Sequence, residues 1–481
     1  MQQDPKADNG LALHRVLGLR DLVLLNIAAV VGLRWLSVAA QIGPSSLILW
    51  ALALLIFFVP LALAVLELSS RFPSEGGLYV WSKTAFGDLH GFIAGWSYWA
   101  SNMVFFPSIL LFAAGISLHI GGSAWRPLAD NVSYSVAYCL IVLWGATALN
   151  NVGLERAKWL QNIGGVATWL VAALVIVCGV VSWHSFGMAT PLTAATLMPD
   201  FGSLATFATL ATIALAYAGL ELGPILGGEI KEPGKIIPRA VLIAGVMIAA
   251  IYIMGTTALL VALPHAQIDI VAGIPQALAA VGDRLGLSFF GPMTAVLLTV
   301  SQLGNVGAWI TGTARLPLVV GVDRYLPRQL ASLHPKYGTP HVALLIQATI
   351  VSIILVASLS SATIHESYLI LIDMTLILTF LPLLYVFAAL PMLRRRAIDG
   401  KAPSYVVPGG AFGCWLVASL GFATTTFAMI ISMMPPEHST NPAGFFAKVV
   451  GGSLLLIGIG LAFYARGVRR QRLVAAAAPA I

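Results

Sequence analysis

Long apolar runs alternate with short polar segments along almost the whole chain. One run, from Leu47 to Leu66, reads LILWALALLIFFVPLALAVL. About 20 consecutive apolar residues allow a helix to cross the hydrocarbon core of a bilayer. We therefore expect twelve spans, near residues 21–41, 46–68, 92–119, 132–149, 163–182, 203–227, 240–263, 287–320, 342–360, 366–393, 412–434 and 443–465. The eighth is too long for one crossing, so we expect its cytoplasmic end to extend beyond the bilayer.

The composition is that of an integral membrane protein. Of the 481 residues, 59% are hydrophobic and only 9% are charged, whereas soluble proteins carry about 25% charged residues. A soluble chain with this balance could not cover its surface with polar groups. The loops are too short for a soluble domain, and the three cysteines fall within spans, so no disulfide framework is expected. We predict an all-α polytopic membrane protein.

Basic residues predict the orientation, because cytoplasmic loops collect lysine and arginine. With a cytoplasmic N-terminus, 22 of the 26 basic residues lie in cytoplasmic segments, Arg126, Arg284 and Lys448 lie outside, and Arg34 lies within a span. We therefore expect a multi-pass protein of the cell (plasma or inner) membrane with both termini in the cytoplasm. The net charge of +7 then faces the anionic lipids of the bilayer and needs no nucleic-acid partner.

The sequence lacks the motifs of common enzymes. Its nine histidines are scattered over loops and span ends, without the i, i+4 pair of a helical zinc site. It contains no phosphate-binding loop of the Walker type and no local pattern of a Ser–His–acid triad. We therefore expect no enzymatic activity, no metal and no cofactor.

The few ionisable residues in the spans fall into two groups. Three lie deep within spans: Arg34, Glu221 and Asp373. An arginine in lipid costs roughly 2.5–3.5 kcal/mol even on the mildest scale, so an intramembrane charge indicates a functional site by default. Three others lie near cytoplasmic span ends, where we expect water to solvate them: Asp21, Glu67 and Glu229.

Helix-breaking residues interrupt two of the spans. The first span carries Gly32 near its centre, and the sixth carries five breakers: Gly219, Gly223, Pro224, Gly227 and Gly228. Glycine costs about 1 kcal/mol per helical position and proline about 3, so we expect both spans to be broken in mid-membrane. Interrupted spans in two halves are typical of transporters with inverted repeats, whose free backbone groups line a cavity. Close helix packing through small residues explains Gly227 and Gly228 equally well.

Four stretches resemble the amino acid–polyamine–organocation (APC) superfamily, over nearly the whole chain. They are RDLVLLNIAAVVGLRWLSVAA in the first span, Ser69–Trp99 with EGGLYVW, Ala216–Ala240 with AYAGLELGPILGGEI, and Gly307–Pro327 with GAWITGTARLPLVV. The resemblance implies the fold of the bacterial leucine transporter, with a 5+5 inverted repeat, broken helices 1 and 6, and two C-terminal helices. It divides the chain into a cytoplasmic segment 1–20, the repeats 21–182 and 203–393, helices 11 and 12 at 412–465, and a cytoplasmic tail 466–481.

Within the superfamily, the chain most resembles the bacterial glutamate/GABA antiporters. The similar pieces are EGGLYVW, YAGLE, AWITG followed by an arginine, and VPGGAFGCWLVASLGF before SMMPPE. The resemblance implies an amino acid permease or exchanger that works by alternating access, on acidic or GABA-like substrates, with a coupling proton or a counter-substrate. The alternatives are a polyamine or other organocation transporter of the same superfamily, and a channel or receptor-like protein. No ring of repeated selectivity residues supports a channel.

Two positions depart from the family pattern. Many members have Gly-Ser-Gly or Gly-Thr-Gly at the break of helix 1, where this chain has Gly32-Leu33-Arg34. The arginine argues against holding a carboxylate with bare backbone alone. Some proton-coupled members have a lysine inside helix 5, where this chain reads GGVATWLV. Coupling by that route is therefore disfavoured.

We expect the substrate to bind in mid-membrane between spans 1, 3, 6, 8 and 10. Nine residues are the predicted substrate-binding set: Val31, Gly32, Leu33, Arg34, Tyr217, Ala218, Gly219, Glu221 and Asn305. Backbone N–H groups near Val31 to Leu33 are expected to hold the substrate carboxylate, and carbonyl groups near Tyr217 to Gly219 the substrate ammonium.

Arg34 and Glu221 each leave alternatives open. The planar guanidinium of Arg34 matches a carboxylate in two-point contact, which favours an acidic amino acid or another monocarboxylate. Otherwise Arg34 forms a fixed ion pair with Glu221 or Asp373 that locks the two repeats together. Glu221 either takes part in the transport cycle, as the partner of Arg34 or as a proton carrier, or satisfies free backbone donors of the broken helix.

Overall fold

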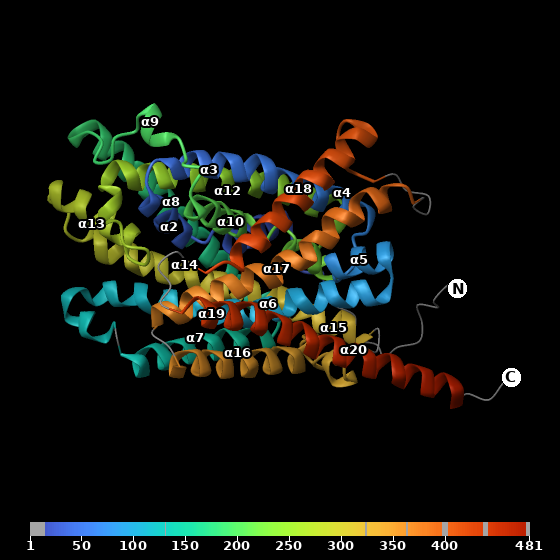
Figure 1. The fold of residues 1–481 in the computed structure, drawn as a ribbon. Coiled ribbons are helices and arrows are strands. Elements are labelled where there is room, and N and C mark those ends of the chain that lie inside the picture. The colour runs from blue at the N-terminus through green and yellow to red at the C-terminus, as the bar shows by residue number, and fades with distance from the viewer. Residues whose placement is uncertain are drawn as a thin grey trace.

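The computed structural model describes residues 15–129, 131–322, 325–361, 364–396, 403–435 and 441–477, which fold almost entirely as helices (Figure 1). The α-helices are α1 (Leu19–Val30), α2 (Arg34–Ile42), α3 (Ser45–Ala53), α4 (Val59–Arg71), α5 (Leu78–Phe86), α6 (Asp88–Ser117), α7 (Val132–Asn151), α8 (Leu154–Phe186), α9 (Ala194–Leu197), α10 (Leu204–Tyr217), α11 (Leu222–Ile225), α12 (Pro233–Ala262), α13 (Gly273–Arg284), α14 (Phe290–Thr313), α15 (Arg315–Val322), α16 (His341–Ser361), α17 (Ile364–Arg394), α18 (Gly410–Ser432), α19 (Pro442–Phe446) and α20 (Gly452–Ala477). The all-α membrane fold expected from the apolar runs is confirmed.

Within the described residues, ten helical segments are long and apolar enough to cross a membrane, and the bent pair α1 and α2 gives an eleventh. The sixth expected span corresponds to α10, which has only 14 residues and is followed by the single turn α11. The count of twelve spans therefore stays a prediction. In Figure 1, α9 and α13 lie at one end of the bundle and α5 and α15 at the other.

Two of the long apolar segments are interrupted in the middle of the bundle. The helix α1 ends at Val30, and α2 starts at Arg34 at an angle of 43° to it. The helix α10 ends at Tyr217, and Gly219 has a φ of +127°, which side chains with a Cβ rarely adopt. A Cβ at Gly219 would also lie only 3.0 Å from the side chain of Val30. The two breaks therefore lie side by side, and a glycine is required where they meet.

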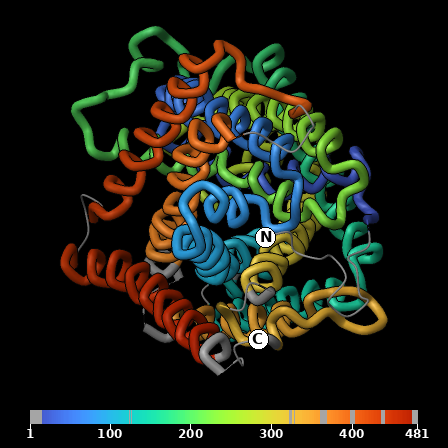
Figure 2. Tube along the Cα trace, turned by 90° about the vertical axis from the view of Figure 1, so that its right-hand side faces the viewer, coloured from blue at the N-terminus to red at the C-terminus, as the bar shows by residue number. Residues whose placement is uncertain are grey.

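The helix α14 is held close to α8. Gly164 of α8 faces Gly304 of α14, and a Cβ on either residue would lie 2.3 Å from the Cα of the other. This backbone contact fixes the part of α14 that faces the break of α1. In contrast, α20 lies at the edge of the bundle (Figure 2). Only 17% of the most apolar stretch of the span Pro442–Leu473, which contains most of α20, is buried.

Candidate functional site

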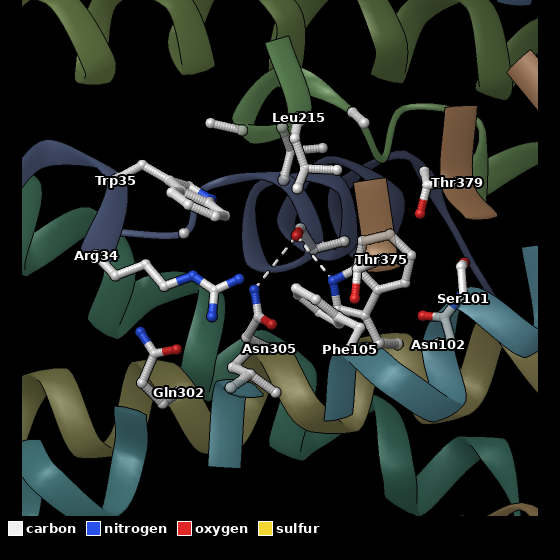
Figure 3. A pocket seen from close by; sticks show the side chains of 17 residues that line it. Arg34, Trp35, Ser101, Asn102, Phe105, Leu215, Gln302, Asn305, Thr375 and Thr379 are labelled. Atoms are coloured by element: carbon white, nitrogen blue, oxygen red, sulfur yellow. Dashed lines mark hydrogen bonds between the residues drawn. The ribbon is translucent and has the colours of Figure 1, made fainter. Parts of the chain in front are cut away.

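A small cavity lies where the two breaks meet. Its walls come from the break between α1 and α2, from α6 and α10, and from α14 and α17 (Figure 3). It has a volume of about 30 Å³, which is room for one or two water molecules. Trp35, Phe105 and Trp309 fill much of the surrounding space, so an amino acid requires these side chains to move.

Two side chains from α14 hold the end of α1. The last carbonyls of a helix have no partner within the helix. Asn305 Nδ2 donates to the carbonyls of Ala28 and Ala29, and Trp309 Nε1 donates to Ala29 at 2.9 Å. Both side chains therefore stabilise the break.

One tyrosine joins the two breaks. The hydroxyl of Tyr252 on α12 lies 2.6 Å from the carbonyl oxygen of Val30 in α1 and 2.8 Å from that of Ala216 in α10. It also accepts a hydrogen bond from the N–H of Gly32 at 3.2 Å. A single neutral side chain thus bonds to backbone groups of both interrupted helices.

Arg34 is buried in the cavity wall without an anionic partner. Its side chain is 2% exposed, and its Cζ lies 4.2 Å from the ring centroid of Trp35, 5.1 Å from that of Phe105 and 6.0 Å from that of Tyr368. Among the described residues no carboxylate lies within 4.0 Å of it, and its Nη1 has no hydrogen-bond partner. Aromatic rings thus stabilise the guanidinium while the N–H donors of Nη1 stay available.

Other polar atoms without partners line the same cavity. Both amide atoms of Gln302, Oδ1 of Asn305 and Oδ1 of Asn102 are buried without a hydrogen bond in the described part of the chain. In Figure 3 the side chain of Arg34 reaches into the cavity from α2, and those of Gln302 and Asn305 reach into it from α14. Buried polar groups are normally paired, so this concentration of unpaired donors and acceptors indicates a place for a polar ligand.

The structure brings four of the nine predicted site residues to the cavity: Gly32, Arg34, Ala218 and Asn305. The N–H of Val31 bonds to Ile27, and that of Gly32 to Val30 and Tyr252, so both groups are already engaged. Val31, Leu33, Gly219, Tyr217 and Glu221 lie outside the lining.

Tyr217 and Glu221 point elsewhere. The ring of Tyr217 packs against Trp50, Phe58 and Tyr252. Glu221 accepts hydrogen bonds from the hydroxyl of Tyr98 at 2.8 Å and from the N–H of Gly219 at 3.0 Å. Its carboxylate therefore satisfies a free donor of the broken helix, as one of the two alternatives expected, and shows no ion pair with Arg34.

The expectation that water solvates the acidic span ends is wrong for two residues. Glu67 is fully buried and pairs with Arg71 at 2.9 Å and Arg394 at 3.5 Å. Glu229 is 3% exposed and pairs with Arg315 at 2.8 Å. Arg394 and Arg315 come from distant parts of the chain, so the sequence could not show these partners.

The comparisons with known proteins agree with this architecture. The amino acid permease family matches residues 17–455. The chain belongs to this family. The permease is 29% identical to an uncharacterised transporter of Legionella pneumophila, over 92% of this chain and 95% of the relative. It is 25% identical to a probable agmatine/putrescine antiporter of Lactococcus lactis, over 88% of each chain, and 23% identical to the glutamate/gamma-aminobutyrate antiporter of that species, over 79% of this chain and 76% of the relative.

The fold is also that of a solved structure. The permease superposes on MhsT in complex with L-phenylalanine with a TM-score of 0.66, over 88% of this chain and 99% of that chain, at 14% identity. The predicted membership of the APC superfamily and the leucine-transporter-like fold are therefore confirmed. The permease is a multi-pass membrane protein and a secondary transporter.

Proposed function

We propose that this permease exchanges acidic or GABA-like amino acids, and that Arg34 binds a substrate carboxylate. The observation that carries the proposal is the buried guanidinium without an anionic partner in the cavity where the two broken helices meet. A buried charge is costly unless it is paired. A carboxylate substrate supplies the missing partner and matches the fork of the guanidinium in two-point contact.

The remaining unpaired atoms suit the other end of an amino acid. Oδ1 of Asn305 and Oδ1 of Asn102 are acceptors without donors, and an ammonium group offers three N–H donors. The amide of Gln302 can serve either end. A polyamine, the alternative class, would bring like charge to Arg34. The relatives include both a glutamate/gamma-aminobutyrate antiporter and an agmatine/putrescine antiporter, so the preference for the acidic class rests on the unpaired guanidinium of Arg34.

Transport by alternating access requires the small cavity to enlarge. An amino acid does not fit into about 30 Å³, so opening must move Trp35 or Trp309 away from the break of α1. The cycle would rock the two repeats against each other, with a counter-substrate or a proton returning in the other half. The strong bias of basic residues supports cytoplasmic termini in the cell membrane, which reporter fusions after Arg20, Arg396 and Arg472 test.

Counterflow in proteoliposomes tests the function directly. Vesicles preloaded with glutamate or GABA should accumulate the labelled external amino acid, and vesicles preloaded with putrescine should not. Arg34→Lys keeps the charge but loses the fork, so the KM for acidic substrates should rise about tenfold or more. The matched control is Arg239→Lys, at an exposed arginine outside the cavity, which should leave the KM unchanged. Exchange of diamines alone, or an unchanged KM in Arg34→Lys, would contradict the proposal.

A further inference from the structure

A second and larger cavity lies between α10, α17 and α18. Its volume is about 340 Å³, within the range of pockets that hold small molecules, while the central cavity holds only one or two waters. Three polar side chains line it, one from each helix: Thr212, Asp373 and Ser432. The apolar part of the lining includes Leu204, Ala208 and Met434.

This cavity lies at the end of the bundle that the basic residues assign to the outside. Leu204 is the first residue of α10, Ser432 is the last residue of α18, and Asp373 lies in the first third of α17. The helices α9 and α13, whose segments carry few basic residues, lie at this end (Figure 1). We therefore call it the outer cavity.

Opposite faces of the same helix line the outer and the central cavities. Thr375 and Thr379 of α17 line the central cavity, and Asp373 lines the outer one. Residues two apart in a helix point about 200° away from each other. The helix α10 likewise lines the outer cavity with its first half and the central cavity with Leu215 and Ala216. Both helices therefore border both cavities, so a movement of either helix changes the walls of both.

A third, small cavity lies between the other two along α10. It has a volume of about 10 Å³ and is lined by α2 and α10. It shares Thr212 with the outer cavity, and Trp35 and Ala216 with the central one. The indole of Trp35, which also packs on Arg34 at 4.2 Å, therefore separates the small cavity from the central one, and its movement would join them.

The polar surface of the outer cavity consists of acceptors. Asp373 has no ion pair within 4.0 Å among the described residues. The hydroxyl protons of Thr212 and Ser432 are already donated to the carbonyls of Ala208 and Met429, so their oxygens face the cavity as acceptors. One carboxylate and two such oxygens suit a group that carries positive charge and several N–H donors.

We propose that Asp373 and the outer cavity form a docking subsite for the ammonium group of the incoming amino acid. The inference rests on the proposed function, because it gives the same substrate a first binding place before it reaches the central cavity. The ammonium binds first at Asp373. After Trp35 has moved, the substrate leaves Asp373 for the central cavity, where its carboxylate binds to Arg34. The apolar lining of Leu204, Ala208 and Met434 leaves room for the remainder of the molecule.

Sided kinetics test the subsite in the full-length permease. Asp373→Asn should raise the KM for the amino acid offered from the outer side about tenfold, and leave the KM from the inner side and the kcat unchanged. Asp373→Glu should restore most of the outer affinity. The control Asp283→Asn removes an exposed carboxylate at the same end and should change neither KM. Equal rises on both sides, or no rise, would overturn the subsite, whereas absence of amino acid exchange in the wild type would overturn the proposed function instead.

A chemical probe tests the subsite without transport. The three native cysteines are buried, so Thr212→Cys places a thiol in the outer cavity. A cationic methanethiosulfonate with an ethylammonium group should modify it about tenfold faster than the anionic ethylsulfonate reagent. Adding Asp373→Asn should abolish this preference. Equal rates for the two reagents with Asp373 present would refute the attraction of ammonium groups to this cavity.

Discussion

Two buried arginines differ in their charged partners: Arg315 has a carboxylate beside it, and Arg34 has none among the described residues. Arg315, at the start of α15, is fully buried and forms a bidentate pair with Glu229, through Nε at 2.8 Å and Nη2 at 3.0 Å. Its Nη1 donates to the carbonyl of Thr311 at 2.7 Å. Arg34, 2% exposed, has aromatic rings around its guanidinium and no carboxylate within 4.0 Å among the described residues.

The difference separates a structural role from a binding role. Removing one partner of a buried ion pair leaves an uncompensated charge, which is costly. Arg315 therefore holds α15 to the segment after α11, and its pairing is complete without a ligand. Arg34 has donors to spare in a cavity with other unpaired polar atoms, so a ligand completes its pairing. The same residue type is thus fully paired in one place and unpaired in the other, which supports the proposed binding role of Arg34.

The largest expected effect is on stability at the paired arginine. Arg315→Met leaves Glu229 buried without its partner and should lower the free energy of unfolding by about 3–5 kcal/mol. Arg34→Met removes an unpaired charge at similar volume, so its stability should equal or exceed that of the wild type. Thermal unfolding of the two purified variants in detergent measures the contrast. Similar losses of melting temperature in both would show that Arg34 has a structural partner after all.

The next effect concerns coupling between Arg34 and Glu221. Glu221 already bonds to Tyr98 and to the N–H of Gly219, so Arg34→Ala and Glu221→Ala should change stability additively, within about 0.5 kcal/mol. The double variant should also fail to regain the uptake that Arg34→Ala loses. The pair Arg315 and Glu229 is the positive control, with a clear coupling energy in the same double-mutant cycle. Restored uptake in the double variant of Arg34 and Glu221 would exclude the carboxylate-binding role.

Sequence patterns predicted the membrane fold and singled out Arg34 at the break of the first span, because both follow from local composition. A run of 20 apolar residues has few other structures available to it, and a charge beside a glycine in such a run is conspicuous. Part of the cavity was also accessible to sequence analysis: Gln302, Asn305 and Trp309 are spaced i, i+3 and i+7, and so share one face of α14. Only Asn305 of these three was predicted.

Other features of the site could not be predicted from the sequence. Tyr252 lies in an unremarkable apolar span, and its role depends on the meeting of α1, α10 and α12 in space. Glu229 pairs with Arg315, and Glu67 with Arg394, both from distant segments, although Arg71, the other partner of Glu67, lies only four residues away. Long-range pairing of this kind leaves no periodic signal in a single sequence.

A second carboxylate near Arg315, besides its partner Glu229, gives a smaller, pH-dependent effect. Glu75 accepts a hydrogen bond from the N–H of Gly228 at 2.7 Å, and its Oε1 is buried without a partner. Burial, followed by the nearby charge of Glu229, raises the pKa of Glu75 from 4.5 to about 8, although Arg315 and the N–H of Gly228 act in the opposite direction. The folded protein then binds more protons than the unfolded chain between these values, so stability falls as the pH rises through this window.

Glu75→Gln should remove this dependence. The variant carries the neutral form permanently, so its melting temperature should match that of the wild type near pH 4.5 and exceed it increasingly up to about pH 8. Glu155→Gln, at an exposed carboxylate near the same end of the bundle, is the control and should show no such trend. An advantage that is constant with pH would mean that Glu75 does not titrate in this range.

The smallest expected effect is the response of the wild type to sodium. Unwound carbonyls and half-helix ends coordinate the coupling cation in transporters with broken helices. Here the last carbonyls of α1 already accept hydrogen bonds from Asn305, Trp309 and Tyr252. Like the carboxylate of Glu229, they have donors from the protein itself. Replacing sodium by choline should therefore leave the exchange rate unchanged.

Asn305→Asp makes this expectation sharp. The change removes the amide donor and places a carboxylate against the carbonyls of Ala28 and Ala29, so that only acceptors meet there. A proton or a cation is then needed to hold them together. The melting temperature of this variant should rise with sodium or at lower pH, while that of the wild type should not. Gln302→Glu is the control, because that side chain lies on the same helix and cavity without bonding to α1. Sodium-dependent exchange in the wild type, with no sodium response in Asn305→Asp, would contradict this expectation. It would show that the side-chain donors to the carbonyls of α1 do not replace a cation, so that these carbonyls, unlike the pair of Arg315 and Glu229, still lack a partner.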